Sequence, residues 1–235
     1  MERLLRPAPD RLIVSEIFGP TFQGEGISVG RHAGFLRLGH CNLTCTWCDT
    51  AYTWDWSRYR PEAELKPMGI AEVADAVRQL GVDLLVVTGG EPLMQQPALA
   101  RLLDLLPGIE IEMETNGTVT PRVAILERVR RFNVSPKLAH SGVPAGKRIN
   151  AGPLLALLRS GRSVFKFVVR GPDDLDEIRA LVDGYGLAPI YVMPEGTDAD
   201  EILRRMRSLT SLVLARGWNL TPRLHILLWG EKRGV

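Results

Sequence analysis

The sequence contains few cysteines and no long hydrophobic run. Three of its 235 residues are cysteine, an odd number that does not suit the disulfide frameworks of small secreted proteins. No stretch of about 18 apolar residues is present, so we expect no membrane-spanning helix. Residues 1–10 hold arginines and prolines rather than the apolar segment of a signal peptide. Cysteines without an export signal indicate a reducing, cytoplasmic location.

An excess of charge of either sign is also lacking. The 29 lysines and arginines nearly balance the 27 acidic residues, which gives a formal net charge of +2. Proteins that bind nucleic acid usually carry a clear excess of basic residues, so direct contact with nucleic acid is not expected. The length and the hydrophobic content of 45% allow one sizeable core. We therefore expect a single domain over residues 1–235, with short N-terminal and C-terminal extensions.

The three cysteines lie within eight positions of each other, at Cys41, Cys45 and Cys48. A four-iron cluster held by three thiolates keeps one iron open for a substrate or cofactor. A structural zinc ion would need a fourth ligand, for which His32 and His40 are candidates. Trp47 directly before the last cysteine, and the long α/β pattern of the remaining chain, favour the cluster over a zinc-stabilised binding module.

Strands and helices alternate along most of the sequence. Apolar runs typical of strands cover residues 12–18, 33–38, 83–87, 109–113, a short run before Ser135, 163–169 and 189–193. Helical patterns cover residues 70–80, 97–106, 121–131, 153–159, 172–183 and 198–215. This alternation predicts parallel βαβ units with right-handed crossovers. About six units are present, fewer than in a closed eightfold barrel, so we predict an α/β fold with a partial, open (β/α)6 barrel. We expect the last apolar run, residues 224–228, to be a strand.

Several short motifs follow predicted strands, where the working residues of parallel α/β barrels lie. They are Gly89-Gly90-Glu91, Glu114-Thr115-Asn116, Ser135-Pro136-Lys137 and Met193-Pro194-Glu195-Gly196. Adjacent glycines allow a backbone to approach a ligand closely, while Glu91 offers an acceptor. Arg37 lies inside an apolar strand, and burying an unpaired guanidinium is costly. We therefore expect Arg37 to face a polar cavity or an anion.

The cysteine loop and Gly-Gly-Glu-Pro resemble the motifs of the radical S-adenosylmethionine (SAM) superfamily. The resemblance narrows to the 7-carboxy-7-deazaguanine synthases because of two further segments, Gln23-Gly24-Glu25-Gly26 and Leu227-Leu228-Trp229-Gly230, and it covers nearly the whole chain. It implies a carbon–nitrogen lyase of deazapurine and queuosine biosynthesis, which converts 6-carboxy-5,6,7,8-tetrahydropterin to 7-carboxy-7-deazaguanine with loss of ammonia. The implied mechanism is hydrogen abstraction by a 5′-deoxyadenosyl radical, ring contraction and regeneration of SAM.

The resemblance also implies roles for individual residues. A 4Fe–4S cluster would be bound by Cys41, Cys45 and Cys48, and Mg²⁺ by the Thr50 hydroxyl. SAM would contact Trp47, Cys48, Asp49, Gly90, Glu91, Ser135, Pro136, Lys137, Met193, Pro194, Glu195 and Gly196. The pterin would contact Phe22, Gln23, Gly24, Glu25, Arg37, Thr88 and His225. A homodimer and a flavodoxin or ferredoxin as electron donor are also implied.

Two interpretations of these residues stay open. A radical SAM activase, which forms a glycyl radical on a partner protein, shares the cysteine spacing, although Glu25 and His225 favour a small-molecule pocket. A carboxylate such as Glu25 can accept the adjacent N–H groups of a pterin, and the Gln23 amide can donate and accept. His225, on an apolar run, can instead be a core histidine with satisfied hydrogen bonds.

Overall fold

The computed structural model describes residues 6–235. Residues 1–5 lie outside the described residues. Two predictions include them: the single domain over residues 1–235 and the lack of a signal peptide in residues 1–10. Within residues 6–235, nine strands form one sheet in the order β3-β1-β2-β4-β5-β6-β7-β8-β9. Their bounds are β1 Arg11–Phe22, β2 His32–Leu38, β3 Lys66–Gly69, β4 Leu84–Gly89, β5 Glu110–Thr115, β6 Arg131–Val134, β7 Ser163–Val169, β8 Ile190–Pro194 and β9 Asn219–Leu220.

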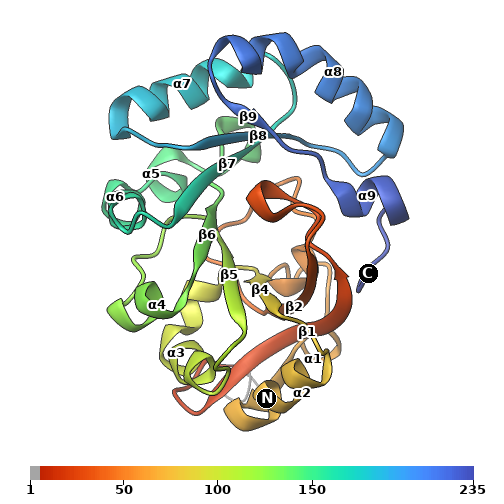
Figure 1. The fold of residues 1–235 in the computed structure, drawn as a ribbon, viewed down its shortest axis with the longest axis vertical. Helices are drawn as coiled ribbons and strands as arrows, with labels where there is room; N and C mark the ends of the chain where they lie inside the picture. Colours follow the sequence, from red (N-terminus) through yellow and green to blue (C-terminus); the bar gives the residue numbers. More distant parts are fainter. Residues whose placement is uncertain (1–5) are drawn as a thin grey trace.

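The predicted helices correspond to α2, α3, α4, α6, α7 and α8. The α-helices are α1 Pro61–Glu64, α2 Ile70–Gln79, α3 Gln96–Asp104, α4 Val123–Arg128, α5 Ala145–Arg148, α6 Ala151–Arg159, α7 Asp174–Tyr185, α8 Ala199–Ala215 and α9 Leu224–Trp229. Short 3-10 turns are η1 Gly26–Ser28, η2 Ala51–Thr53, η3 Pro92–Gln95 and η4 Ala139–Ser141. In Figure 1 the longer helices lie along one side of the curved sheet, and the chain end after α9 lies beside β1.

The pairing of the strands confirms the predicted fold class. From β2 to β9 every neighbouring pair is parallel. The sheet keeps two edges, β3 and β9, and is therefore an open barrel rather than a closed one. β1 pairs antiparallel with β2 and β3, an arrangement that the sequence pattern does not predict.

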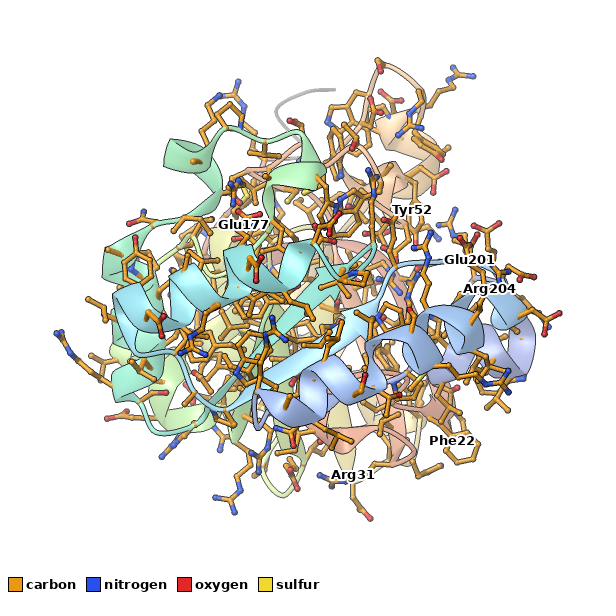
Figure 2. The ribbon with its side chains drawn as sticks, turned by 90° about the horizontal axis from the view of Figure 1, so that it is seen from above. Phe22, Arg31, Tyr52, Glu177, Glu201 and Arg204 are labelled. Carbon is orange, nitrogen blue, oxygen red and sulfur yellow. The ribbon has the colours of Figure 1, made fainter. Side chains whose placement is uncertain are left out.

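The two faces of the sheet bury different residues, because successive side chains of a strand point to opposite faces. Ile111 and Met113 of β5 and Phe165 and Phe167 of β7 belong to the main hydrophobic core. That core lies between the sheet and α2, α3, α4, α6, α7 and α8, and Figure 2 shows α7 and α8 next to each other across β7 and β8. The intervening positions face the inside of the curve and carry buried polar side chains such as Glu112, Asn133 and Lys166. The inner face is thus built for a polar site.

The prediction of a strand over residues 224–228 is wrong, because these residues form helix α9. A short apolar run cannot be assigned to a strand or a helix by its periodicity alone. In α9, Ile226 is buried whereas Leu228 and Trp229 are exposed, so one side of the helix packs on the protein. No helix within residues 6–235 has the length and apolar character to span a membrane.

Candidate active site

A cavity of about 780 Å³ opens among the loops at the C-terminal ends of the parallel strands. Most of the predicted site residues line it: Phe22, Gln23, Gly24, Glu25, Arg37, Cys41, Cys45, Trp47, Cys48, Asp49, Thr50, Thr88, Gly90, Ser135, Lys137, Met193, Glu195, Gly196 and His225. Three predicted residues, Glu91, Pro136 and Pro194, lie outside the lining. The fold therefore brings the predicted cofactor and substrate residues to one place.

The cysteine loop, residues 39–50, leaves the end of β2 and packs against the end of β4. The Gly90 amide donates to the Leu38 carbonyl at 3.0 Å. A Cβ atom on Gly90 would lie 2.0 Å from the His40 carbonyl oxygen, and one on Gly89, whose φ is +143°, would lie 2.1 Å from the Leu38 oxygen. The two adjacent glycines therefore allow the end of β4 to pack closely against the end of β2 and the cysteine loop.

The three cysteine thiols are free and line the cavity together. Burial raises the pKa of Cys41 to about 12 and also raises the pKa of Cys45. Cys48 Sγ accepts a hydrogen bond from Trp54 Nε1 at 3.3 Å, and Cys41 Sγ accepts one from Leu43 N at 3.4 Å. Thiols lose their protons when they bind a metal, and N–H donors to sulfur are typical of iron–sulfur sites. The donor set fits a cluster with three cysteine ligands.

The same residues do not form a zinc site. Within residues 6–235, no group of three His, Cys, Asp or Glu side chains is arranged to hold a single metal ion. His32 begins β2 while the cysteine loop follows Leu38 at its other end, a separation of about 20 Å at about 3.3 Å per residue. The His40 ring packs edge-on against Trp56, with 6.1 Å between centroids. In a four-iron cluster each thiolate binds a different iron, so the sulfurs need not converge on one point.

Trp47, Ser135 and Lys137 form a second group on the cavity wall. Lys137 Nζ donates to Ser135 Oγ at 3.0 Å and lies 5.5 Å from the centroid of the Trp47 ring. Trp47 stacks on His140, with 5.4 Å between centroids, and its indole N–H is buried without a partner among the described residues. An aromatic face beside a cation is suited to a nucleoside cofactor.

Glu91 is fully buried rather than open to the cavity. Its carboxylate accepts hydrogen bonds from Leu93 N at 3.0 Å, Thr115 Oγ1 at 2.8 Å and Asn116 N at 2.8 Å. Burial raises the pKa of Glu91. The side chain ties the end of β4 to the end of β5, and a direct contact with SAM stays a prediction.

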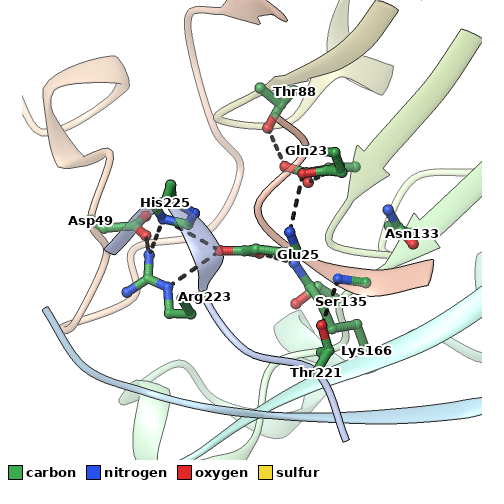
Figure 3. Close-up of polar contacts among 12 residues, drawn as sticks. Gln23, Glu25, Asp49, Thr88, Asn133, Ser135, Lys166, Thr221, Arg223 and His225 are labelled. Carbon is green, nitrogen blue, oxygen red and sulfur yellow. Dashed lines mark hydrogen bonds and ion pairs between the residues drawn. The ribbon is translucent and has the colours of Figure 1, made fainter. Parts of the chain in front are cut away.

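Glu25 lies at the centre of a buried charge network (Figure 3). Its carboxylate forms ion pairs with Lys166 Nζ and, at 3.3 Å, with Arg223 Nε, and His225 Nε2 lies 3.9 Å away. Arg223 also forms an ion pair with Asp49. Burial alone would raise the pKa of Glu25, but Lys166, Arg223 and His225 outweigh it and hold this pKa well below its usual range. Glu25 is therefore ionised at neutral pH.

The segment around Glu25 is positioned by the chain just before and inside α9. Leu224 N donates to the Gly24 carbonyl at 2.8 Å, and Gly26 N donates to Thr221 Oγ1 at 3.0 Å. A Cβ atom on Gly24 would lie 2.2 Å from His225 Nδ1, so only glycine allows this packing. Residues near the two ends of the described chain thus build one wall of the cavity.

The Gln23 amide forms three hydrogen bonds inside the protein. Its Nε2 donates to Glu112 Oε1 at 2.8 Å and to Glu114 Oε1 at 3.2 Å, and its Oε1 accepts from Glu25 N at 3.3 Å. Thr88 Oγ1 donates to Glu114 Oε2 at 2.7 Å. Gln23 is 1% exposed and its amide orients two carboxylates in this structure, while a direct contact with the substrate stays a prediction.

Arg37 and His225 line the cavity as expected. The Arg37 charge is already paired, because its Nε donates to Glu16 Oε2 at 2.6 Å. The His225 side chain is 28% exposed, which is more than a core histidine would show. Burial lowers the pKa of His225 despite the nearby Glu25 carboxylate, so the imidazole is neutral at pH 7.

Thr50 lines the cavity, with its Oγ1 3.6 Å from Cys48 Sγ. Mg²⁺ takes six oxygen ligands and commonly draws several from substrate and water. The Thr50 hydroxyl is an oxygen donor of the kind that such a site uses, and its role as a Mg²⁺ ligand stays a prediction.

Sequence reasoning missed Lys166, Arg223 and Glu112. Lys166 carried a usable signal, because it is the single charged residue of the apolar strand Ser163–Val169, as Arg37 is of its own strand. Glu112 carried a similar signal, because it is an acidic residue within the predicted apolar strand 109–113. Arg223 carried none, since its role depends on partners that lie far away in the sequence.

Comparison with known proteins agrees with this geometry. The model of the family described as the radical SAM superfamily matches residues 37–206. A 7-carboxy-7-deazaguanine synthase of Pyrobaculum aerophilum is 38% identical over 232 residues, which cover 97% of this chain and 99% of that protein. One from Hyperthermus butylicus is 35% identical, with 92% of each chain covered.

Among solved structures, QueE from Escherichia coli shares the fold. The TM-score is 0.67 at 24% identity, and the match covers 92% of this chain and 95% of QueE. Radical SAM enzymes use SAM together with a 4Fe–4S cluster, and the cysteine loop fits that cluster. By its sequence identity over nearly its full length, this chain belongs to the 7-carboxy-7-deazaguanine synthases of the radical SAM superfamily.

Proposed function

We propose that this protein converts 6-carboxy-5,6,7,8-tetrahydropterin into 7-carboxy-7-deazaguanine and ammonia, as a lyase of deazapurine and queuosine biosynthesis. The observation that carries the proposal is the 38% sequence identity with a 7-carboxy-7-deazaguanine synthase over 97% of this chain. It is supported by a single cavity that has the cysteine loop on one wall and the Glu25 network on another.

The proposed cofactor half of the cavity contains the cysteine loop. Cys41, Cys45 and Cys48 would hold the 4Fe–4S cluster, and Trp47 with Lys137 would contact SAM. The remaining proposed SAM contacts are Asp49, Gly90, Ser135, Pro136, Met193, Pro194, Glu195 and Gly196, with Glu91 supporting the loop from behind. When bound, the cluster and SAM supply the one-electron chemistry that removes a hydrogen atom from the substrate.

The proposed substrate half contains Glu25. A pterin presents a ring N–H beside an exocyclic amine, and a carboxylate can accept both. Lys166 and Arg223 keep the carboxylate ionised and leave it unused lone pairs, since each oxygen has about two acceptor positions. Thr88 and Glu114 would form the neighbouring polar contacts. Arg37 and Thr50 with Mg²⁺ would meet the substrate carboxylate.

We further infer a cytoplasmic homodimer that receives electrons from a flavodoxin or ferredoxin. The absence of an excess of basic residues supports a small-molecule substrate rather than a nucleic acid. One continuous sheet with one main core supports a single domain.

An anaerobic assay with SAM, Mg²⁺, a reductant and carboxytetrahydropterin tests the proposal. We expect 7-carboxy-7-deazaguanine by mass spectrometry, and deuterium from the carboxylate-bearing carbon of labelled pterin should be recovered in SAM. Cys45→Ala is the control that lacks a cluster ligand. Protein loaded with its cluster that cleaves SAM without converting the pterin would contradict the proposal and favour an activase.

A further inference from the structure

Residues 230–235 follow α9 and line the cavity, together with the cysteine loop and the Glu25 segment. Among residues 6–235, no backbone hydrogen bond joins residues 231–235 to the rest of the chain. Four of these five residues are exposed. The position of this wall of the cavity therefore depends on side-chain contacts.

Arg233 makes those contacts, and it reaches three separate elements. Its Nε donates to Glu16 Oε1 of β1 at 3.1 Å, and its Nη2 donates to Glu64 Oε2 of α1 at 3.0 Å. The guanidinium carbon lies 3.6 Å from the centroid of the Tyr52 ring in η2. Charged hydrogen bonds and a cation over an aromatic face act on the same group.

Glu16 connects this contact to the substrate half of the cavity. Its other oxygen accepts hydrogen bonds from Arg37 Nε at 2.6 Å and from Tyr52 Oη at 3.0 Å. Because Arg233 holds one oxygen of Glu16, the other oxygen has a fixed position for its hydrogen bond from Arg37. The orientation of Arg37, a cavity residue, is thus linked to the attachment of residues 230–235.

We propose that Arg233 is a positioning residue that clamps residues 230–235 onto β1, η2 and α1 as a wall of the cavity and, through Glu16, orients Arg37 toward a small anionic heterocycle. This inference rests on the proposed function for the identity of that heterocycle. The side chain of Arg233 is 46% exposed, those of Glu16 and Glu64 are 16% and 19% exposed, and Glu16 keeps its hydrogen bonds from Arg37 and Tyr52 when Arg233 is replaced. Loss of the clamp should therefore release the wall without unfolding the protein.

The test uses the cluster-loaded enzyme with four variants. Arg233→Met keeps a stem of similar length and removes the charge. Glu64→Gln weakens the clamp from α1, at a residue that does not line the cavity. The double variant tests whether both substitutions act through one contact. Arg179→Met is the matched control, because Arg179 forms an exposed pair with Asp183 within α7.

Hydrogen exchange and kinetics give separate readouts. In Arg233→Met we expect faster exchange at the hydrogen-bonded amides of Leu227 and Gly230, which lead into residues 231–235, and an unchanged melting temperature. We expect the KM for carboxytetrahydropterin to rise about tenfold, equivalent to about 1.4 kcal/mol, with a much smaller change in kcat. Glu64→Gln should shift both readouts in the same direction, the double variant should add little to Arg233→Met, and Arg179→Met should match wild type.

Unchanged exchange in both Arg233→Met and Glu64→Gln would refute the clamp. Faster exchange with an unchanged KM would refute its role at the substrate site. Wild-type enzyme that does not convert the pterin would overturn the proposed function instead, while the exchange measurement would still decide whether Arg233 holds residues 230–235.

Discussion

Replacing Glu25 by glutamine should destabilise the folded protein. We expect a larger loss of stability than for the same substitution at a substrate-binding glutamate that has no buried ion-pair partner. The substitution removes the negative charge that pairs with Lys166 and Arg223 but preserves the shape of the side chain. Arg223 retains its pair with Asp49. Among the described residues, Lys166 has Glu25 as its one ion-pair partner, and its side chain is 5% exposed. Glu25→Gln therefore leaves a buried lysine without a partner.

The cost can be estimated from that orphaned charge. Removing one partner of a buried ion pair costs about 3–5 kcal/mol, and we expect about 3 kcal/mol because only one of the two cations is orphaned. For a chain of this size, about 1 kcal/mol lowers the melting temperature by about 2–4 °C, which predicts a decrease of about 6–12 °C. Adding Lys166→Met removes the buried charge, so the double variant should regain most of the lost stability.

Calorimetry of the cluster-loaded proteins under anaerobic conditions measures this effect. The pKa of Glu25 is lowered in the folded protein, so its contribution is present above the unfolded value of about 4.3 and is lost as the pH falls toward the folded value. The difference between wild type and Glu25→Gln should thus be constant from pH 7 to 8, where His225, whose pKa is lowered by burial, is neutral. Equal melting temperatures for wild type, Glu25→Gln and the double variant would refute the buried pair.

Three further predictions concern the proposed metal ligands and the loop that supports them. Cys45→Ala should stay folded by circular dichroism but lose its iron and all SAM cleavage, and a variant that keeps four irons would contradict the ligand assignment. Thr50→Ala should reduce the dependence of turnover on Mg²⁺ more than it weakens SAM binding. A Mg²⁺ titration of turnover and a SAM binding isotherm measure the two effects, and an unchanged dependence on Mg²⁺ would exclude Thr50 as a ligand. In Gly90→Ala the new Cβ would lie 2.0 Å from the His40 carbonyl oxygen, so we expect a loss of stability of about 1–3 kcal/mol, as overpacking causes, and faster loss of iron from the cluster. A rate of iron loss equal to that of wild type would show that the cysteine loop and the segment after β4 can separate without cost.

The sequence pattern predicts the parallel part of the fold well, because each βα unit is short and carries its own periodicity. It fails for α9, where six residues are too few to separate a helix from a strand. The antiparallel β3–β1 edge depends on pairing between residues such as Ile13 and Pro67, which no local signal encodes.

The site shows the same division between local motifs and distant partners. Local motifs identify the cysteines, Gly90 and Glu25, since their spacing carries the chemistry. The partners of these residues are less visible. Glu25 is held by Lys166 and Arg223 from other elements, and sequence alone cannot tell that the Gln23 N–H₂ group donates to two neighbouring carboxylates.

The contact between Glu25 and Arg223 also orders events during synthesis, because the two residues are 198 positions apart. At about 5–20 residues per second, a ribosome needs about 10–40 s to travel from one codon to the other. The cysteine loop and the strands from β2 to β8 are translated within that interval. A nascent chain therefore contains every proposed cluster ligand well before Arg223 can pair with Glu25, and its cluster half can mature while its substrate half is still incomplete.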